Sequence, residues 1–429
     1  MSSPAIFSML WPKNQRVLTT LVRRQPGTAI LSISDLVSAE FREAIAAAGG
    51  TVVCVDTLLT SEERQALSHQ LAGREQALQI ALKDPAWQQQ WASFPLPPER
   101  LAQQLLQVAT RQLPALVPFV AALDRARAQY DLRLIALNED MTALPRLLVA
   151  WGKQHRVPSL HLSHGVELGI PYTIHAQLHA DITAVFGERG KEGYQDIGLD
   201  ESSLRITGNP AWDDYPQLRK QRPQIRARLA LQHGLSPELP IVVFGTTWAA
   251  NLTAFSDEGI HGKTLHSFLA AAQQLIQVGT MLQVVVKDRP GAPPTAAERM
   301  WRLVSELAIP PSYVRYATGN DARDWVVAAD VMVSMQSNLS VEAMLVGVPA
   351  IDMLTEIGTW LGPCFGAGSG ILEVEPWALS QVLAEVLSSA ELRQRQLQAM
   401  QRAVHLHNIS VDGSATHRVV ALMEELIAA

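Results

Sequence analysis

Asp330-Val-Met-Val-Ser-Met-Gln-Ser-Asn-Leu-Ser-Val-Glu-Ala-Met-Leu-Val-Gly-Val-Pro-Ala-Ile-Asp-Met353 carries the clearest structural pattern in the chain. Its apolar residues 331–335 predict a buried strand, and residues 341–346 predict a helix that stops at Gly347 and Pro349. A second apolar strand, 350–353, follows at once. Two strands joined by a short helix predict a parallel βαβ crossover, the repeating unit of α/β folds.

Polar residues fill the turn between the first strand and the helix: Gln336, Ser337, Asn338 and Ser340. In a parallel sheet such a turn lies at the carboxyl edge, where ligands bind. Hydroxyls, an amide and the free N–H groups of a helix start suit an anion. We therefore expect Ser337, Asn338 and Ser340 to hold phosphate oxygens.

Composition describes a well-packed globular protein. A chain of 429 residues, 48% hydrophobic and 18% charged, is not disordered, and its length predicts two domains of roughly 200 residues each. A net charge of −6 gives no general attraction to nucleic acid, so no such partner is expected. The two cysteines, Cys54 and Cys364, suit a reducing compartment.

No membrane-spanning or secretory segment is expected. The chain has no apolar run of about 18 residues, and its N-terminus does not have the pattern of a signal peptide. We therefore predict a cytoplasmic protein. Peripheral contact with the inner face of the membrane stays open as an alternative.

Strands and helices alternate along both halves of the chain. Strands are expected at 28–34, 51–56, 132–137, 159–163, 182–186, 204–207, 241–244, 282–287, 313–316, 331–335 and 350–353. Residues 61–130 interrupt this alternation and predict several inserted helices. The pattern predicts an α/β protein with two Rossmann-like, doubly wound domains; that these domains face a central cleft is what the family resemblance described below implies. The predicted domains are 1–217 and 218–404, with a helix at 405–429 that packs back on the body.

Candidate acid–base residues follow two strands of the first half. His164-Gly165 ends one strand, and an imidazole near neutrality can accept a hydroxyl proton or bind phosphate; a turn histidine without a role is the alternative. Glu139 and Asp140 end the preceding strand and could act as base or nucleophile. Helix capping is the favoured interpretation for Asp140, and a solvated carboxylate is the alternative for Glu139. No metal-binding spacing is found among the nearby histidines.

Candidate phosphate-binding residues follow two strands of the second half. Lys287 and Arg289 place two cations at a strand end, where they suit a nucleotide phosphate; a solvated charged turn is the alternative. Thr246 and Thr247 follow the first strand of this half and are expected to face the same cleft.

Residues 130–355 resemble GT-B glycosyltransferases, in particular the bacterial surface-polysaccharide and CDP-glycerol glycerophosphotransferase branch. The resemblance rests on four motifs and the Ser337–Pro349 segment, in the family's order: Asn138-Glu139-Asp140, His164-Gly165, Gly208-Asn209-Pro210 with Asp213, and Lys287-Asp288-Arg289. It implies that Glu342 accepts from ribose hydroxyls; a carboxylate favoured by the helix dipole is the alternative. Arg289 stands where the family often has histidine, which leaves open whether this site donates a proton or only charge.

The resemblance implies a metal-independent glycosyltransferase that moves a sugar from a nucleotide-sugar donor to a bacterial surface polysaccharide, of the capsule or lipopolysaccharide type. The donor would leave its phosphate at Lys287, Arg289 and the turn at 337–340, and His164 or Glu139/Asp140 would transfer the proton. A glycan or lipid-linked glycan is the expected acceptor, no cofactor is expected, and contact with partner transferases stays open. The alternatives are a CDP-glycerol-type glycerophosphotransferase, a non-hydrolysing UDP-sugar 2-epimerase, and a nucleotide-sugar-binding scaffold without activity.

Overall fold

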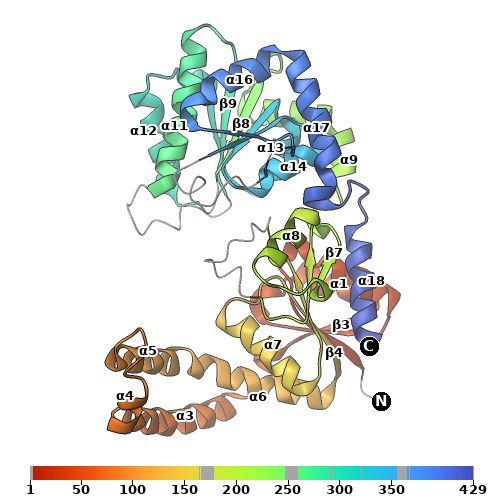
Figure 1. The fold of residues 1–429 in the computed structure, drawn as a ribbon. Coiled ribbons are helices and arrows are strands. Elements are labelled where there is room, and N and C mark those ends of the chain that lie inside the picture. Colours follow the sequence, from red (N-terminus) through yellow and green to blue (C-terminus); the bar gives the residue numbers. More distant parts are fainter. Residues whose placement is uncertain are drawn as a thin grey trace.

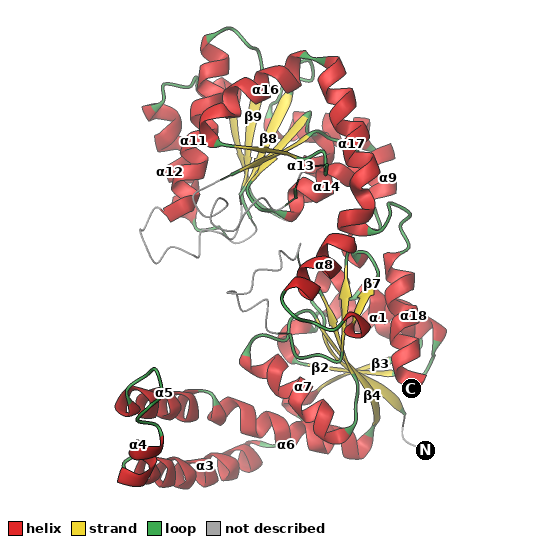
Figure 2. Cartoon of the chain, in the orientation of Figure 1, coloured by secondary structure: helices red, strands yellow, loops and turns green. Residues whose placement is uncertain are grey.

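The computed structural model describes residues 3–163, 165, 178–246, 259–289, 292–319, 321–354, 365–366 and 368–428. It contains two parallel sheets with helices on their faces, one in each half of the chain (Figure 1 and Figure 2). We call the half built on the first sheet the N-terminal lobe and the other the C-terminal lobe. The predicted α/β fold of two Rossmann-like units is confirmed.

The sheet of the N-terminal lobe has the strand order β3-β2-β1-β4-β5-β6-β7, and all its pairs are parallel. Its strands are β1 (Pro4–Met9), β2 (Ala29–Ser32), β3 (Thr51–Cys54), β4 (Asp131–Leu137), β5 (Ser159–Leu162), β6 (Ile182–Val185) and β7 (Leu204–Ile206). The sequence did not predict β1, although it pairs with both β2 and β4 and carries four buried residues. Strand β1 therefore lies in the middle of this sheet.

The sheet of the C-terminal lobe has the order β10-β9-β8-β11-β12-β13 and is also parallel. Its strands are β8 (Ile241–Gly245), β9 (Gln283–Lys287), β10 (Val314–Ala317), β11 (Val331–Ser334), β12 (Ala350–Met353) and β13 (Leu372–Val374). Strand β11, helix α14 (Asn338–Val346) and strand β12 form the predicted crossover. Gly347 ends α14 with a φ of 74°, a left-handed conformation that glycine adopts without steric cost.

Helices cover both sheets (Figure 2). In the N-terminal lobe they are α1 (Arg16–Arg24), α2 (Ala39–Ala47), α3 (Ser61–Ala81), α4 (Pro85–Gln90), α5 (Pro98–Arg111), α6 (Leu113–Gln129), α7 (Ala143–His155) and α8 (Glu188–Asp196). The remaining helices are α9 (Tyr215–Lys220), α10 (Arg222–His233), α11 (Gly259–Gln277), α12 (Pro294–Glu306), α13 (Ala322–Ala328), α14, α16 (Leu379–Ser388), α17 (Ala390–Asn408) and α18 (Ala415–Ala428).

The insertion expected at 61–130 is helical. Helices α3, α4 and α5 extend away from the N-terminal lobe, and α6 leads back to it (Figure 1). Among the described residues, no single helix has the length and apolarity to cross a membrane; α5 and α6 pass that test only as a pair, with a 50° bend between them.

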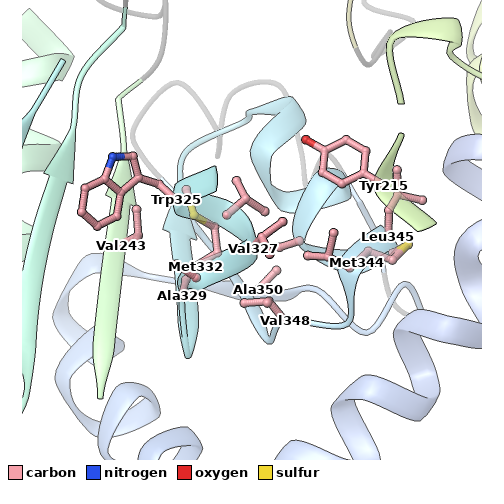
Figure 3. Packing of buried hydrophobic residues seen from close by; sticks show 14 of the residues in the cluster. Tyr215, Val243, Trp325, Val327, Ala329, Met332, Met344, Leu345, Val348 and Ala350 are labelled. Atoms are coloured by element: carbon pink, nitrogen blue, oxygen red, sulfur yellow. The ribbon is translucent and has the colours of Figure 1, made fainter. Parts of the chain in front are cut away.

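The largest apolar cluster joins the connection between the lobes to the C-terminal sheet. Tyr215 of α9, Ile225 and Leu229 of α10 and Trp325 of α13 pack with residues of β8, β11, α14 and α17 (Figure 3). Trp325 is fully buried, and the His233 ring lies 4.9 Å from its ring, edge to face. Residues 215–233 are therefore packed against the C-terminal lobe and do not form an exposed linker.

Two chain segments cross between the lobes, and they are hydrogen-bonded to each other. The Asn209 N–H donates to the Asn408 side-chain oxygen at 2.8 Å, and the Asp213 carboxylate accepts from the N–H groups of Ala415 and Thr416, both at 2.8 Å. Asp213 thereby satisfies free donors at the start of α18. Helix α18 then packs on α1, so the end of the chain lies on the N-terminal lobe (Figure 1).

Candidate functional site

The carboxyl edges of the two sheets face each other between β5 and β11. A β-carbon placed on Gly165, which follows β5, would lie 3.7 Å from both polar atoms of the Asn338 side chain at the start of α14. The carboxyl edges of the two parallel sheets thus come close together at this junction, as the sequence predicted. The candidates His164 and Thr247 lie outside the described residues.

The turn before α14 presents the start of a helix to this junction. Ser337 is the N-cap, and its hydroxyl accepts from the Leu339 N–H at 3.3 Å. Gln336 has a φ of 45°, and its N–H donates to the Asp352 carboxylate at 2.8 Å. The carboxylate of Asp352 on the neighbouring strand β12 therefore holds the turn, and the start of α14 is fixed at the sheet edge.

Ser340 lies inside the protein rather than on the ligand side of the turn. Its side chain is fully buried, and its hydroxyl lies 2.7 Å from that of Ser334 on β11. Burial raises the pKa of the adjacent Asp352 carboxyl well above its usual value, while the hydrogen bond from the Gln336 N–H opposes this rise. The structure thus gives Ser340 a structural position, in contrast to the phosphate contact expected from the sequence.

Glu342 connects α14 to the segment that enters the C-terminal lobe. Its carboxylate accepts from the Trp212 indole N–H at 3.2 Å and from the Tyr215 hydroxyl. Burial raises the pKa of Glu342, and the hydrogen bond from Tyr215 opposes this rise. A carboxylate has about four acceptor positions, so these two bonds leave room for a further donor.

Lys287, at the end of β9, is buried and has internal partners. Its ammonium donates to the Asp288 carbonyl at 2.5 Å and the Gly319 carbonyl at 3.0 Å, and it lies 3.6 Å from the Asp321 carboxylate. Burial lowers the pKa of Lys287, while the charge of Asp321 opposes that change. The side chain is only 2% exposed, so the Lys287 ammonium lies below the protein surface at this edge of the sheet.

Asp288 is a buried acceptor between β8, β9 and β10. It accepts from the hydroxyls of Thr246 at 2.6 Å and Tyr316 at 2.8 Å, and from the Arg289 N–H at 2.8 Å. The Thr246 hydroxyl was expected to face the cleft, but it donates to Asp288 inside the C-terminal lobe. Arg289 is half-buried and follows this network at the sheet edge.

Glu139, rather than Asp140, binds the free N–H groups before α7. Glu139 accepts from the N–H groups of Met141 and Thr142, both at 3.0 Å, so it holds the turn before α7. Asp140 was expected to cap this helix. Instead it is fully buried and accepts from the N–H groups of His179 at 2.5 Å and Ala180 at 2.7 Å.

The histidines near β5 do not form a metal site in the described residues. His161 is buried within β5, with its Nε2 3.3 Å from the Asn138 carbonyl oxygen. Across the part of the chain that the structure describes, no group of three or more His, Cys, Asp or Glu side chains could hold a metal ion.

The loop at 10–15, which follows β1, is a functional candidate that was not predicted from the sequence. Lys13 lies 5.4 Å from the centre of the Trp11 ring, and its charge favours the ionised form of Glu342. The Trp11 N–H donates to the Asn138 side chain at 2.6 Å. The apolar run Pro4–Met9 before this loop was the available signal, because a strand at that place predicts a ligand-edge turn at 10–15.

No protein-family model and no curated protein matches the sequence. Solved structures match it over almost its whole length. Anabaena HepE with UDP and glucose has a TM-score of 0.55 and 12% identity, covering 98% of this chain and 99% of its own. A glycosyltransferase from Rickettsia africae has a TM-score of 0.58 and 12% identity, and the match covers 100% of this chain and 99% of that protein. The Neisseria meningitidis UDP-GlcNAc 2-epimerase bound to UDP-GlcNAc has a TM-score of 0.58 and 10% identity, and the match covers 99% of this chain and 100% of that protein. The chain therefore has the GT-B fold, which confirms the expected architecture.

Proposed function

We propose that this protein is a glycosyltransferase that moves a sugar from a nucleotide-sugar donor to a glycan or lipid-linked glycan of a bacterial surface polysaccharide. The close approach of Gly165 to Asn338 is the observation that carries this proposal, because it brings the carboxyl edges of both sheets near each other. The likeness to structures with UDP or a UDP-sugar bound supports a nucleotide-sugar as the donor.

The donor would bind mainly to the C-terminal lobe. The start of α14, with Ser337 and Asn338, offers N–H groups and an amide to the diphosphate, and the helix dipole favours its negative charge. Arg289 adds a guanidinium at the end of β9, the second strand from β11, and Lys287 adds a buried positive charge behind it. Glu342 has acceptor positions left for the ribose hydroxyls.

His164 is our candidate for the base that takes the acceptor proton. It precedes Gly165, the residue that meets the donor-side helix. Glu139 and Asp140 are weaker candidates, because backbone N–H groups already engage both carboxylates and Asp140 is fully buried. Stabilisation of the leaving diphosphate by fixed charges would supply much of the rate without a metal.

A 2-epimerase acting on a single UDP-sugar is the second candidate. It is favoured by the Neisseria epimerase, which aligns over the whole chain with the same TM-score as the Rickettsia glycosyltransferase. The two reactions are separated by one assay, since an epimerase converts UDP-N-acetylglucosamine without an acceptor. A transferase would release the nucleotide when an acceptor is supplied.

Nucleotide binding tests the donor site. We expect one of UDP, CDP, GDP or CMP to bind the wild-type protein, and CDP in particular would favour the glycerophosphotransferase alternative. Asn338→Ala is expected to weaken that nucleotide about tenfold, because a hydrogen bond to a charged phosphate is lost. Isothermal titration calorimetry measures both. Gln381→Ala on the exposed face of α16 is the matched control, and equal affinity of the two variants would contradict the assignment.

Turnover tests the base. His164→Ala is expected to lower kcat by about 10²- to 10⁴-fold while the nucleotide affinity stays unchanged. Asp140→Asn is the comparison: it removes a buried charge that binds two backbone N–H groups, so stability falls but the folded enzyme keeps its kcat. The reverse outcome, with His164→Ala active and Asp140→Asn inactive, would move the base to Asp140.

A further inference from the structure

A polar pocket lies between the N-terminal lobe and the end of α17, beside the junction. It is lined by residues that follow β5 and β6, by the start of α8 and by the end of α17, among them Ser163, Gly165, Gly187, Arg189, Gly190 and His407. Its empty volume is about 270 Å³, a figure that includes solvent at the open mouth, so the pocket is too small for a whole nucleotide. None of the donor-site residues of the C-terminal lobe lines it.

The start of α8 supplies backbone donors to this pocket. Gly187 is the N-cap and offers no side chain, and within the described residues no acceptor meets the N–H groups of Glu188, Arg189 or Gly190. A β-carbon on Gly187 would lie 2.5 Å from the Leu406 carbonyl oxygen. Glycine at this position therefore lets α17 close one side of the pocket while the helix start stays open to a ligand.

Two buried polar side chains in the pocket have no hydrogen-bond partner among the described residues. Ser163 is 2% exposed and His407 is 3% exposed, and within the described chain neither the Ser163 hydroxyl nor either His407 ring nitrogen makes a hydrogen bond. Leaving a buried donor unpaired is costly, and such groups in native proteins call for an explanation. A ligand atom that accepts from both would remove that cost.

Arg189 adds a cation without a counter-charge. No ion pair or hydrogen bond of its guanidinium is found among the described residues, and it lies 3.4 Å from the place a β-carbon on Gly366 would take. The nearby acid Glu373 already accepts from the N–H groups of Phe365 and Gly366, at 2.9 and 3.1 Å. A guanidinium, a helix start, a hydroxyl and an imidazole are the groups that bind phosphate and carboxylate.

We propose that this pocket is an anion site that holds a phosphate or carboxylate of the acceptor substrate. The identity of the ligand as the acceptor rests on the proposed function; the anion site itself does not. Gly165 lines the pocket and also lies close to Asn338, so an acceptor anchored here by its anionic group would place its neighbouring hydroxyls at the junction with the donor lobe. The position favours an acidic sugar or a sugar phosphate over a neutral glycan.

Calorimetric titration of the full chain with glycerol 1-phosphate and, separately, with glucuronate tests the site at constant ionic strength. We expect at least one of the two to bind, and the tighter one identifies the anion. Arg189→Gln is expected to weaken it about 10- to 100-fold, and Ser163→Ala several-fold, because charged hydrogen bonds are lost. Arg402→Gln, an exposed arginine on α17, is the matched control and should bind like wild type.

Ser163→Ala keeps the test decisive, since removing an unpaired hydroxyl does not threaten folding. If neither anion binds, or if Arg189→Gln and Ser163→Ala bind as wild type does, the proposal is overturned. Titration of the same variants with the matching nucleotide separates the two proposals. Anion binding without any nucleotide binding would contradict the proposed function alone, and nucleotide binding without anion binding would contradict the anion site alone.

Discussion

Replacing Trp325 by alanine is expected to lower the free energy of unfolding by about 3–5 kcal/mol, the usual cost of removing a buried aromatic side chain. Trp325 is fully buried in the cluster that joins α10 and α13 to the C-terminal sheet (Figure 3). Its indole N–H also donates to the Asp321 carboxylate at 3.0 Å. The substitution therefore leaves a cavity and removes a donor from a carboxylate that faces Lys287.

Urea unfolding followed by far-UV circular dichroism measures this loss, with the midpoint falling at constant slope. Trp325→Phe is the matched variant, because it keeps most of the packing and removes only the N–H group. Its expected loss is smaller, about 1 kcal/mol. Since Asp321 also lies 3.6 Å from the Lys287 ammonium, Trp325→Phe should weaken nucleotide binding more than an equally destabilising change in α1. Equal stability of Trp325→Ala and wild type would contradict the packing role.

Lowering the pH from 7 to 5 is expected to cost the folded state about 2 kcal/mol through His407 alone. Burial and the positive charge of Arg189 lower the pKa of His407 to about 4, from its usual 6.5. Between these values the unfolded chain binds a proton that the folded chain does not, so stability falls as the pH decreases. The contribution is complete above about pH 6.5 and is lost progressively towards pH 4.

Denaturant midpoints at a series of pH values measure this effect. His407→Gln should flatten the curve between pH 7 and 5, whereas His69→Gln on the exposed face of α3 should leave it unchanged. Asp412 acts in a separate window, because the hydrogen bond from Arg418 lowers its pKa to about 2 and its contribution is lost only below about pH 3.8. Identical slopes for wild type and His407→Gln would show that His407 is not the titrating group.

Most of the strands and helices were predicted from periodicity because strands buried on both faces form short apolar runs between polar turns. β1 was missed because its run, Pro4–Met9, has no turn signal before it. β13 was missed because three residues, Leu372–Val374, are too few for a pattern. Both lie where local sequence carries least information, although β1 occupies the centre of its sheet.

The candidate site was predicted less completely because the sequence does not show which way a polar side chain points. Helix α14 begins at Asn338, three residues before the predicted start, and this places Ser340 against Ser334 instead of at the surface. Asp140 finds its partners at His179 and Ala180, about forty residues away, which no local rule could indicate. Arg189 and His407 meet only through the fold, since they come from different lobes.

Helix α18 returns to the N-terminal lobe, so the C-terminal lobe is an insertion within the sequence of the N-terminal lobe. Val419, Val420 and Met423 belong to the same apolar cluster as Leu18 and Leu21, so this core is incomplete until α18 has left the ribosome. A chain shortened before Ala415 would expose that apolar face and is expected to be captured by chaperones or proteases.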